Sequence, residues 1–438
     1  MRWFGLFILC LIGMLGALSY QLFSILLQPI QTELAISDTA IGLINGLGIA
    51  TVGAIAAFPI GWAADRYGRR LMLAASVLTW SAFVVVMGLA GSQTAFTVGA
   101  VGINLGDAAL IPLLYGIVAT AYVGKQRDLA NAILVFTLTV GSAATLSLGG
   151  FLLQYFSGAP VADLAPWRTV CVAVALIGFI VTPFLEVVPG KGAPGQAQIA
   201  SVASHSANDG FVDFFRANGV TISLTFFGIT FYYVAFFTLL FWAPALLERR
   251  FGMSTAEASI ALGTPLIFAS IGGIVLANIG LALVRERWQE ATPLRMVIIG
   301  CLVALLPAIG AAFATTGDQF IFALALMNLG VTISLSLAPT LLQSCAPDAF
   351  RSRTIAVFPI IALVVRVIFP AMIPWLSTRL GGEPQVLRLV NVITFVSCLL
   401  LSIIILKLIE PRYVALARDV SERDAPSRKT AYRTSLSV

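Results

Sequence analysis

Two charged residues lie near the middle of long apolar segments, and they are the first candidates for chemistry. Asp107 lies in the segment 95–122 and Arg366 in the segment 354–378. A charged residue at the centre of a membrane-spanning helix costs about 2.5–3.5 kcal/mol on insertion scales, so accidental retention is disfavoured. Two interpretations stay open. Either the two residues form a buried ion pair that holds helices together, or Arg366 binds an anionic substrate while Asp107 binds a coupling proton or a cationic group.

A proline lies close to each of these charged residues and changes the hydrogen bonding of the expected helix. Pro370 comes four residues after Arg366, and Pro112 comes four residues after Ala108. Because proline has no amide hydrogen, each removes the hydrogen bond to the carbonyl group four positions earlier. Free carbonyl groups at this depth are tolerated where they face protein or a water-filled cavity. We therefore expect both residues to lie in polar surroundings.

Neutral polar and aromatic side chains in other apolar segments are further candidates for substrate contacts. They are Gln21 in the first segment, Asn104 one turn before Asp107, and Asn328 in the segment 318–345. Residues 226–242 form an aromatic run, which in a membrane helix usually faces lipid or packs against other helices. Within that run, Tyr232 and Tyr233 offer hydroxyl groups to a substrate.

Composition places these residues on membrane-spanning helices. The chain is 59% hydrophobic and 11% charged, whereas soluble domains have about 25% charged residues. Its mean hydropathy is +0.97. Repeated apolar segments of about 20 residues match the thickness of the bilayer core, so the sequence predicts an all-α membrane protein with twelve transmembrane helices. Ser37 or Asp38 is expected to cap the second of them.

A polar segment in the middle of the chain divides these helices into two groups of six. The expected division is a first six-helix bundle at 1–188, a cytoplasmic linker at 189–217, a second six-helix bundle at 218–410 and a cytoplasmic tail at 411–438. The linker is expected to end in a short surface helix at 211–216, and the tail to be disordered. Residues 36–40 have a counterpart at 253–257, again after the first helix of a group, which indicates an internal repeat.

One short turn between apolar segments has a specific pattern, G-x-x-x-D-R-x-G-R-R. It contains Gly61, Asp65, Arg66, Gly68, Arg69 and Arg70. The pattern resembles the loop between helices 2 and 3 of the major facilitator superfamily. That resemblance implies two six-helix bundles with pseudo-twofold symmetry around a central cavity, and transport by alternating access. It also implies that the aspartate and the arginines form a cytoplasmic charge cluster that latches the two halves together.

Two further segments resemble family motifs with substitutions. Residues 102–108 resemble the R-x-x-x-G-x-G-E-A stretch of spinster-like and organic-ion members, with Asp107 in the place of the acid and Ala100 in the place of the arginine. Residues 141–150 resemble the antiporter motif G-x-x-x-G-P-x-x-G-G, but Thr145 and Leu146 replace its central Gly-Pro. A packing face of small residues is therefore the favoured interpretation of the second segment.

The distribution of arginine and lysine predicts the orientation. Most of them lie in the loops between helices 2–3, 4–5, 8–9 and 10–11 and in the tail, which the positive-inside rule places in the cytoplasm. Both termini are then cytoplasmic, in an inner or plasma membrane. Arg249 and Arg250 are exceptions on the outer side, where lipid headgroups could accommodate them.

Several classes of function lack support in the sequence. Five scattered cysteines in apolar segments indicate neither disulfides nor a metal site, and the one histidine, His205, lies in the linker. No G-x-x-x-x-G-K-[ST] loop occurs, so direct use of ATP is not expected. The net charge of +6 reflects membrane topology rather than nucleic-acid binding, since the basic residues lie in loops and the tail. We expect no cofactor and no enzymatic activity.

The sequence therefore predicts a secondary active transporter. It moves a small organic solute, for which an organic anion is the first choice, with H+ as the expected coupling ion of a symporter. It is expected to be a monomer among membrane lipids. The alternative is an exporter of amphipathic drugs or lipids, which the aromatic run favours and the missing Gly-Pro disfavours. A membrane enzyme or a channel would not explain the 61–70 loop.

Overall fold

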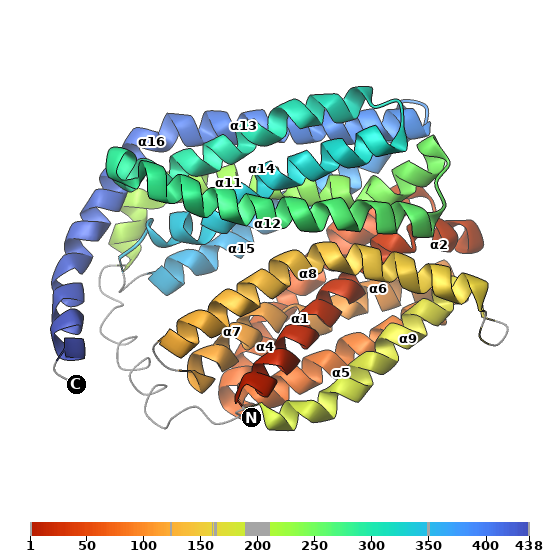
Figure 1. The fold of residues 1–438 in the computed structure, drawn as a ribbon, viewed down its shortest axis with the longest axis horizontal. Helices are drawn as coiled ribbons and strands as arrows, with labels where there is room; N and C mark the ends of the chain where they lie inside the picture. Colours follow the sequence, from red (N-terminus) through yellow and green to blue (C-terminus); the bar gives the residue numbers. More distant parts are fainter. Residues whose placement is uncertain are drawn as a thin grey trace.

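The computed structural model describes residues 2–122, 125–159, 161, 164–188, 211–347 and 351–436, and these form helices joined by short turns and loops. Figure 1 shows two helical bundles, with residues 2–188 in the lower one and residues 211–436 in the upper one. We call them the N-terminal and C-terminal halves. Eleven segments of the described chain are long and apolar enough to span a membrane. One of them, Thr255–Phe313, contains two helices, so twelve spanning helices are present as predicted.

The elements follow one another in a regular order in both halves. The N-terminal half contains α1 (Arg2–Ile25), α2 (Leu27–Leu34), α3 (Asp38–Leu43), η1 (Ile44–Ala50), α4 (Thr51–Tyr67), α5 (Arg69–Gly88), α6 (Gln93–Asp107), α7 (Leu110–Ala121), α8 (Lys125–Gly158), α9 (Pro166–Val181) and η2 (Thr182–Val187). The C-terminal half contains α11 (Phe211–Phe251), α12 (Thr255–Trp288), η3 (Gln289–Ala291), α13 (Thr292–Phe313), α14 (Gly317–Gln343), α15 (Arg351–Arg379) and α16 (Pro384–Leu436).

Equivalent serine caps begin the second spanning helix of each half. The Ser37 hydroxyl accepts a hydrogen bond from the Ala40 amide at 3.2 Å. Ser254 accepts one from Glu257, whose carboxylate in turn accepts one from the Ser254 amide, which completes a capping box. Such caps satisfy amide groups that have no partner within the helix. The expected cap at Ser37 is confirmed, and the matching caps support the repeat predicted from the sequence.

The second spanning helix contains a π-helical segment, η1, that the sequence did not predict. Small residues on α3 and η1 allow α15 to approach closely. A β-carbon at Gly42 would lie 2.5 Å from the Pro370 carbonyl oxygen, and one at Gly46 would lie 2.6 Å from that of Val367. A β-carbon placed on Gly53 of α4 would have no neighbouring atom within 4 Å. Glycine is therefore required for close packing at two of these positions and not at the third.

The fourth spanning helix is broken where the first charged residue lies. Helix α6 ends at Asp107, and α7 begins at Leu110. The Ala108 amide still donates to the Asn104 carbonyl at 3.0 Å, and the ladder resumes where the Leu113 amide donates to the Ala109 carbonyl. Proline at 112 cannot donate to Ala108, as expected, so the break has a cause in the sequence. It leaves Asp107 in the last turn of a half-helix.

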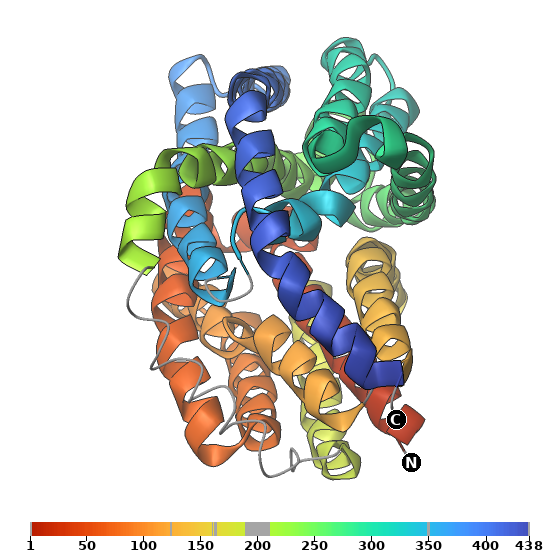
Figure 2. The ribbon, with the colours of Figure 1, turned by 90° about the vertical axis from the view of Figure 1, so that its left-hand side faces the viewer.

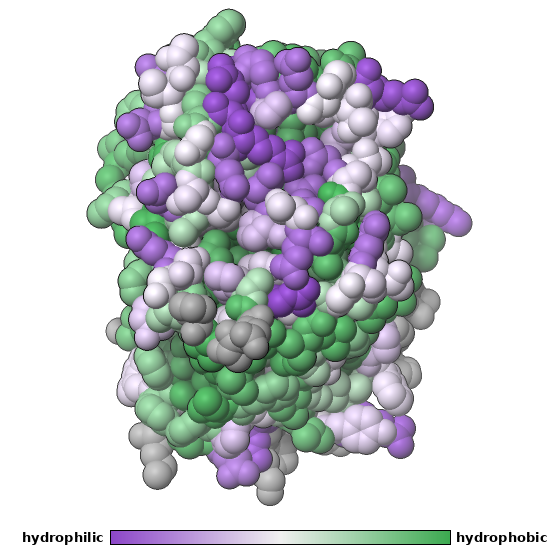
Figure 3. Space-filling view, turned by 90° about the vertical axis from the view of Figure 1, so that its right-hand side faces the viewer, coloured by the Kyte–Doolittle hydropathy of each residue, from purple (hydrophilic) through white to green (hydrophobic). Residues whose placement is uncertain are grey.

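Two pairs of helices make most contacts between the halves, α8 with α12 and the α3–η1 segment with α15. We call the end of the molecule that holds Asp38, Gly158 and Thr255 the outer end, following the predicted orientation; it lies on the right of Figure 1. The opposite end, with residues 61–70 and Trp288, is the inner end. Figure 3 looks onto the outer end, where hydrophilic side chains cover much of the upper part of the face.

Two segments near the ends of the C-terminal half differ from the prediction. Residues 211–216, expected to be a separate surface helix, form the first turns of α11. Helix α16 continues past the expected span into the tail, which was predicted to be disordered. Side chains at helical spacing are buried there, namely Tyr413, Leu416, Ala417 and Val420. Figure 2 shows α16 extending across the inner end of the molecule from the upper half. The linker residues 189–210 lie outside the described residues.

Candidate functional site

The two charged residues near mid-span face each other across the interface between the halves. Asp107 lies beside α1, since a β-carbon at Gly16 would be 3.0 Å from its Oδ1 atom. Arg366 lies on α15 of the opposite half, and its side chain is exposed although it is near the middle of its helix. The two charges interact electrostatically. Among the described residues, however, no salt bridge within 4.0 Å joins them.

Two tyrosines lie close to Asp107 and Arg366, and we call these four residues the charged layer. Tyr20 on α1 interacts electrostatically with Arg366, Asp107 and Tyr233. Tyr233 on α11 was a predicted candidate, whereas Tyr20 was missed. Tyr20 precedes the candidate Gln21 and is itself a polar side chain in an apolar segment, which is the signal that could have identified it.

Tyr232, the other tyrosine candidate, lies in a different environment. It is fully buried, and it interacts electrostatically with Cys301 on α13 and with Tyr233. Its hydroxyl group has no hydrogen-bond partner among the described residues. Successive residues of an α-helix point about 100° apart, so Tyr232 and Tyr233 point in different directions. The Tyr233 ring instead lies 4.6 Å from the Phe237 ring, between centroids, which directs it along the interface.

A small cavity lies next to the charged layer and is lined by both halves. Its volume is about 30 Å³. The walls include Phe236, Phe237, Leu240 and Leu266, and the polar lining side chains are Gln21, Ser142, Ser270 and Asn328. We call this the polar cavity. Two candidates from the sequence, Gln21 and Asn328, line it together with two serines that the sequence did not identify.

The polar groups of this cavity are only partly used within the protein. The Asn328 amide nitrogen donates to the Leu266 carbonyl oxygen at 3.0 Å and to the Ser270 hydroxyl at 2.9 Å. Its amide oxygen is left as an acceptor. Gln21 makes no hydrogen bond to any other described residue. Buried amides usually have partners, so this pair of side chains is suited to bind a polar molecule from outside the protein.

Asn104, the remaining candidate, lies on α6 one turn before Asp107. It is 8% exposed, and its amide nitrogen has no partner among the described residues. It does not line the polar cavity. It is therefore placed near the charged layer, within the N-terminal half.

A cluster at the outer end joins the halves directly, and the sequence did not predict it. The Arg249 guanidinium on α11 donates to Asp38 at 2.7 and 2.9 Å, to Gln28 at 2.8 Å and to Gln31 at 2.6 Å. We call these four residues the outer cluster. A bidentate contact with a carboxylate is among the stronger hydrogen-bonded arrangements in proteins. Arg249, which was an exception to the charge rule, therefore has a partner in the other half.

Between the outer cluster and the polar cavity, hydrogen bonds and aromatic side chains close the interface. The Ser24 hydroxyl donates to the Phe241 carbonyl oxygen at 2.6 Å, and the Phe23 and Phe241 rings lie 5.1 Å apart edge to face. The Ser147 hydroxyl donates to the Ile260 carbonyl oxygen at 3.3 Å. Among the described residues, all hydrogen bonds between the halves lie on the outer side of the charged layer. The interface is therefore closed at the outer end.

The hydrogen bonds described for the 61–70 loop at the inner end stay within its own half. Arg69 donates to the Gly116 carbonyl oxygen at 2.9 Å, and Arg70 donates to that of Glu186 at 3.3 Å. Gly68 adopts φ +97°, which favours glycine, between α4 and α5. The Arg66 guanidinium lies over the ring of Trp62 at 5.6 Å. The side chain of Asp65 is not among those described, and Gly61 has no neighbour within 4 Å of a β-carbon placed on it.

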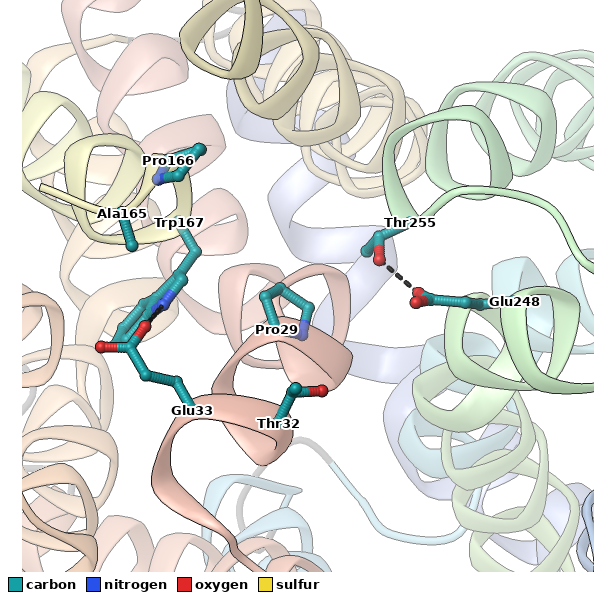
Figure 4. A pocket seen from close by; sticks show the side chains of 8 residues that line it. All are labelled: Pro29, Thr32, Glu33, Ala165, Pro166, Trp167, Glu248 and Thr255. Carbon is teal, nitrogen blue, oxygen red and sulfur yellow. Dashed lines mark hydrogen bonds between the residues drawn. The ribbon is translucent and has the colours of Figure 1, made fainter. Parts of the chain in front are cut away.

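A wider depression opens at the outer end, with a volume of about 520 Å³ (Figure 4). Figure 4 shows Glu33 and Trp167 on one side of it and the hydrogen bond between Glu248 and Thr255 on the other. Glu33 forms a salt bridge with Arg168 at 2.7 Å and accepts a hydrogen bond from the Trp167 indole at 2.6 Å. Burial raises the pKa of Glu33, but these hydrogen bonds and the charge of Arg168 lower it more, so the pKa lies below its ordinary value of 4.5.

Three comparisons with known proteins bear on this arrangement. The family model described as Major Facilitator Superfamily matches residues 9–370. An MFS-type efflux pump of Mycolicibacterium smegmatis is 27% identical over 384 residues, which cover 87% of this chain and 86% of the pump. A putative tartrate transporter of Agrobacterium vitis is 24% identical over 390 residues, which cover 84% of this chain and 82% of the relative.

Among solved structures, a bacterial homologue of the human lysosomal transporter spinster, in an inward-facing and unoccupied conformation, matches with a TM-score of 0.73. The sequences are 21% identical, and the match covers 96% of this chain and 98% of the other. A D-xylose–proton symporter matches with a TM-score of 0.67 at 17% identity, over 92% of this chain and 97% of the other. These structural matches establish the fold.

Proposed function

Since the chain belongs to the major facilitator superfamily of transporters, we propose that it carries a small organic anion across the membrane by alternating access, coupled to protons. The observation that carries this proposal is the placement of Arg366 and Asp107. A guanidinium is exposed at mid-membrane depth, and a carboxylate of the opposite half interacts with it without forming a salt bridge. An exposed cation at this depth fits a binding site for an anion better than a structural pair.

The charges of Arg366 and Asp107 provide a way to couple substrate binding to proton binding. Arg366 can be neutralised by Asp107 or by the carboxylate of a substrate. When a substrate carboxylate binds Arg366, Asp107 loses its attractive partner, and an unpaired carboxylate at this depth is stabilised by taking up a proton. Substrate and proton then bind together, which is the behaviour of a symporter. Since the two residues belong to opposite halves, their interaction changes as the halves move during alternating access.

The closed outer end supports an inward-facing state. If the outer end faces the outside, as the distribution of positive charge predicts, the interface described here is closed toward the outside. An inward-facing state is also the one named for the spinster homologue that this chain resembles. We propose that the outer cluster stabilises it, and that the 61–70 loop stabilises the opposite, outward-facing state.

The names of several relatives favour an anion as substrate. Two putative tartrate transporters, a hexuronate transporter and a probable L-galactonate transporter are among them. A second candidate function, export of amphipathic compounds, has its own support, because the efflux pump is 27% identical over most of both chains. The two functions differ in the charge of the substrate and the direction of transport.

Transport by the protein reconstituted in liposomes tests the proposal. Arg366→Ala should abolish uptake of organic anions. Arg366→Lys should retain a weakened uptake, because the charge persists without the two-pronged guanidinium. Asp107→Asn should still bind substrate but should no longer respond to a pH gradient, since the amide cannot release a proton. Uptake of amphipathic cations with no response to Arg366→Ala would instead support the exporter.

If Asp107 and Arg366 instead form an ion pair that only holds the helices together, the same variants should behave differently. Removing one partner of a buried ion pair costs about 3–5 kcal/mol, so each single variant would be unstable. The double variant with Asp107→Asn and Arg366→Gln would then recover both thermal stability and transport. A double variant that transports like the wild type would remove both residues from the site.

A further inference from the structure

We propose that the polar cavity is a hydroxyl-binding subsite, so that the preferred substrates are hydroxylated monocarboxylates. This rests on the proposed function, because the carboxylate is assigned to Arg366. In this assignment the carboxylate end of the substrate lies in the charged layer, and the hydroxyl-bearing carbon chain extends toward Gln21 and Asn328. Neither the residues of this subsite nor a preference for one carboxylate follows from membership of the family.

The chemistry of the lining is that of a site for neutral polar groups. All four polar side chains, Gln21, Ser142, Ser270 and Asn328, are uncharged, and they offer both donors and acceptors. The Asn328 amide oxygen and the whole Gln21 amide are free to bind, since neither is used in a hydrogen bond to another described residue. A hydroxyl group donates one hydrogen bond and accepts others, so it matches such a lining. A second carboxylate would find no cation there.

The volume of the cavity limits what enters it in this state. About 30 Å³ is enough for one or two water-sized groups, and too little for a whole organic acid. One hydroxyl-bearing carbon fits, with the rest of the substrate in the charged layer. The rings of Phe236 and Phe237 form the apolar wall that a carbon chain would contact.

The distance between the charged layer and the polar cavity indicates the length of the substrate. Tyr233 lies in the charged layer and Phe237 lines the cavity, one helical turn later on α11. One turn of an α-helix rises about 5.4 Å. On α1, Tyr20 and Gln21 are adjacent, which places the cavity next to the charged layer. A carboxylate on Arg366 and a hydroxyl group in the cavity are then separated by a chain of several carbons, as in a five- or six-carbon acid.

Binding of three six-carbon probes to the purified full-length protein tests this inference. They are D-gluconate, with one carboxylate and five hydroxyl groups; hexanoate, with one carboxylate and no hydroxyl groups; and D-glucarate, with two carboxylates. We expect D-gluconate to bind at least about tenfold more tightly than hexanoate, since several neutral hydrogen bonds contribute. D-Glucarate should bind more weakly than D-gluconate, because its second carboxylate is unpaired.

Gln21→Leu is the decisive variant, since Gln21 holds no other described residue in place. It should weaken the binding of D-gluconate by about tenfold and leave the affinity for hexanoate unchanged. The matched control is Asn391→Leu on α16, which also replaces a buried amide in the membrane but lies outside the cavity. It should leave the ratio of the two affinities at its wild-type value. Circular dichroism and thermal unfolding of both variants establish that they are folded.

The outcomes separate this inference from the proposed function. Equal binding of D-gluconate and hexanoate by the wild type, or equal weakening of both by Gln21→Leu, would overturn the subsite and leave the anion transporter standing. If no carboxylate binds while a cationic amphiphile does, the proposed function fails and the subsite fails with it. Loss of the preference for D-gluconate in Gln21→Leu alone supports both.

Discussion

The outer and inner ends of the interface both carry arginines, but the arginines have different partners. At the outer end, Arg249 reaches across to Asp38, Gln28 and Gln31 of the other half. At the inner end, Arg69 and Arg70 bind carbonyl oxygens of their own half. The recognisable motif, residues 61–70, therefore lies at the inner end, where its described hydrogen bonds stay within one half. The hydrogen bonds that join the halves at the outer end are made by residues that belong to no motif.

This difference indicates how a two-state transporter uses its charges. Contacts across the interface stabilise one state and must break in the other. Among the described residues, the outer end is the engaged one. The 61–70 loop is expected to be engaged only when the outer cluster is broken. The comparison can be tested by changing residues at each end, beginning with those whose substitution should matter most.

The largest effect is expected where the backbones of η1 and α15 touch, next to Arg366 near the middle of the interface. Gly46→Val places a side chain where a β-carbon alone would be 2.6 Å from the Val367 carbonyl oxygen, so α15 cannot close against η1. We expect transport to fall to background while the protein still inserts in the membrane. Gly53→Val is the control, because nothing lies within 4 Å of a β-carbon there. Normal transport by Gly46→Val would show that closure at this point is not needed.

The next effect is expected in the outer cluster. Arg249→Ala removes the ion pair and leaves Asp38 without its partner in the other half, so the outer end should open more readily. Transport should fall by roughly tenfold, equivalent to about 1.4 kcal/mol. The neighbouring Arg250 binds Gln385 within its own half, and Arg250→Ala should have little effect.

A charge exchange sharpens this test. The double variant with Arg249→Asp and Asp38→Arg should recover part of the transport lost in each single variant, because the pair is restored with its ends exchanged. Crosslinking of cysteines placed on opposite sides of the outer end would report closure independently of transport. Equal transport by Arg249→Ala and Arg250→Ala would remove the outer cluster from the mechanism.

A smaller effect is expected at the inner end. Asp65→Asn should impair transport several-fold with membrane insertion intact, because the outward-facing state loses the charge of a proposed latch residue. The variant should therefore crosslink at the outer end at least as well as the wild type. Wild-type transport rates in correctly folded Asp65→Asn would contradict a latch at this end.

The sequence predicted the helices well and the contacts between halves poorly. Twelve spanning helices follow from apolar length alone, which no tertiary contact can override in a membrane. The continuation of α16 was missed because its apolar residues, beginning at Tyr413, are spaced among charged ones. The π-helical η1 was missed because its form depends on packing against α15.

For the candidate site, individual residues were easier to predict than their directions. Asp107, Arg366, Gln21, Tyr233 and Asn328 lie at the interface or its cavity because a polar residue within a spanning helix avoids lipid. The burial of Tyr232 within the C-terminal half could not be predicted, since composition alone does not give the rotation of a helix. The partnership of Arg249 with Asp38 joins residues far apart in the sequence, and no local pattern indicates it.

The smallest effect concerns a pair at the outer end that lies within one half. The salt bridge of Glu33 with Arg168 joins α2 to α9, so it should affect stability and not the balance between states. The pKa of Glu33 is lower in the folded protein than its ordinary value of 4.5. Its contribution to stability is therefore complete above about pH 4.5 and is lost as the pH falls through the lower, folded-state pKa.

Thermal unfolding of the wild type and of Glu33→Gln between pH 7 and pH 3 measures this contribution. Because the Glu33 side chain is 39% exposed, solvent screens the pair, and the difference at pH 7 should be at most about 1 kcal/mol. The difference should shrink toward zero at the acid end, since protonated glutamate and glutamine are then alike in charge. Transport at pH 7 should change little, in contrast to Arg249→Ala. A large loss of transport in Glu33→Gln would mean that contacts within the N-terminal half also set the balance between the two ends.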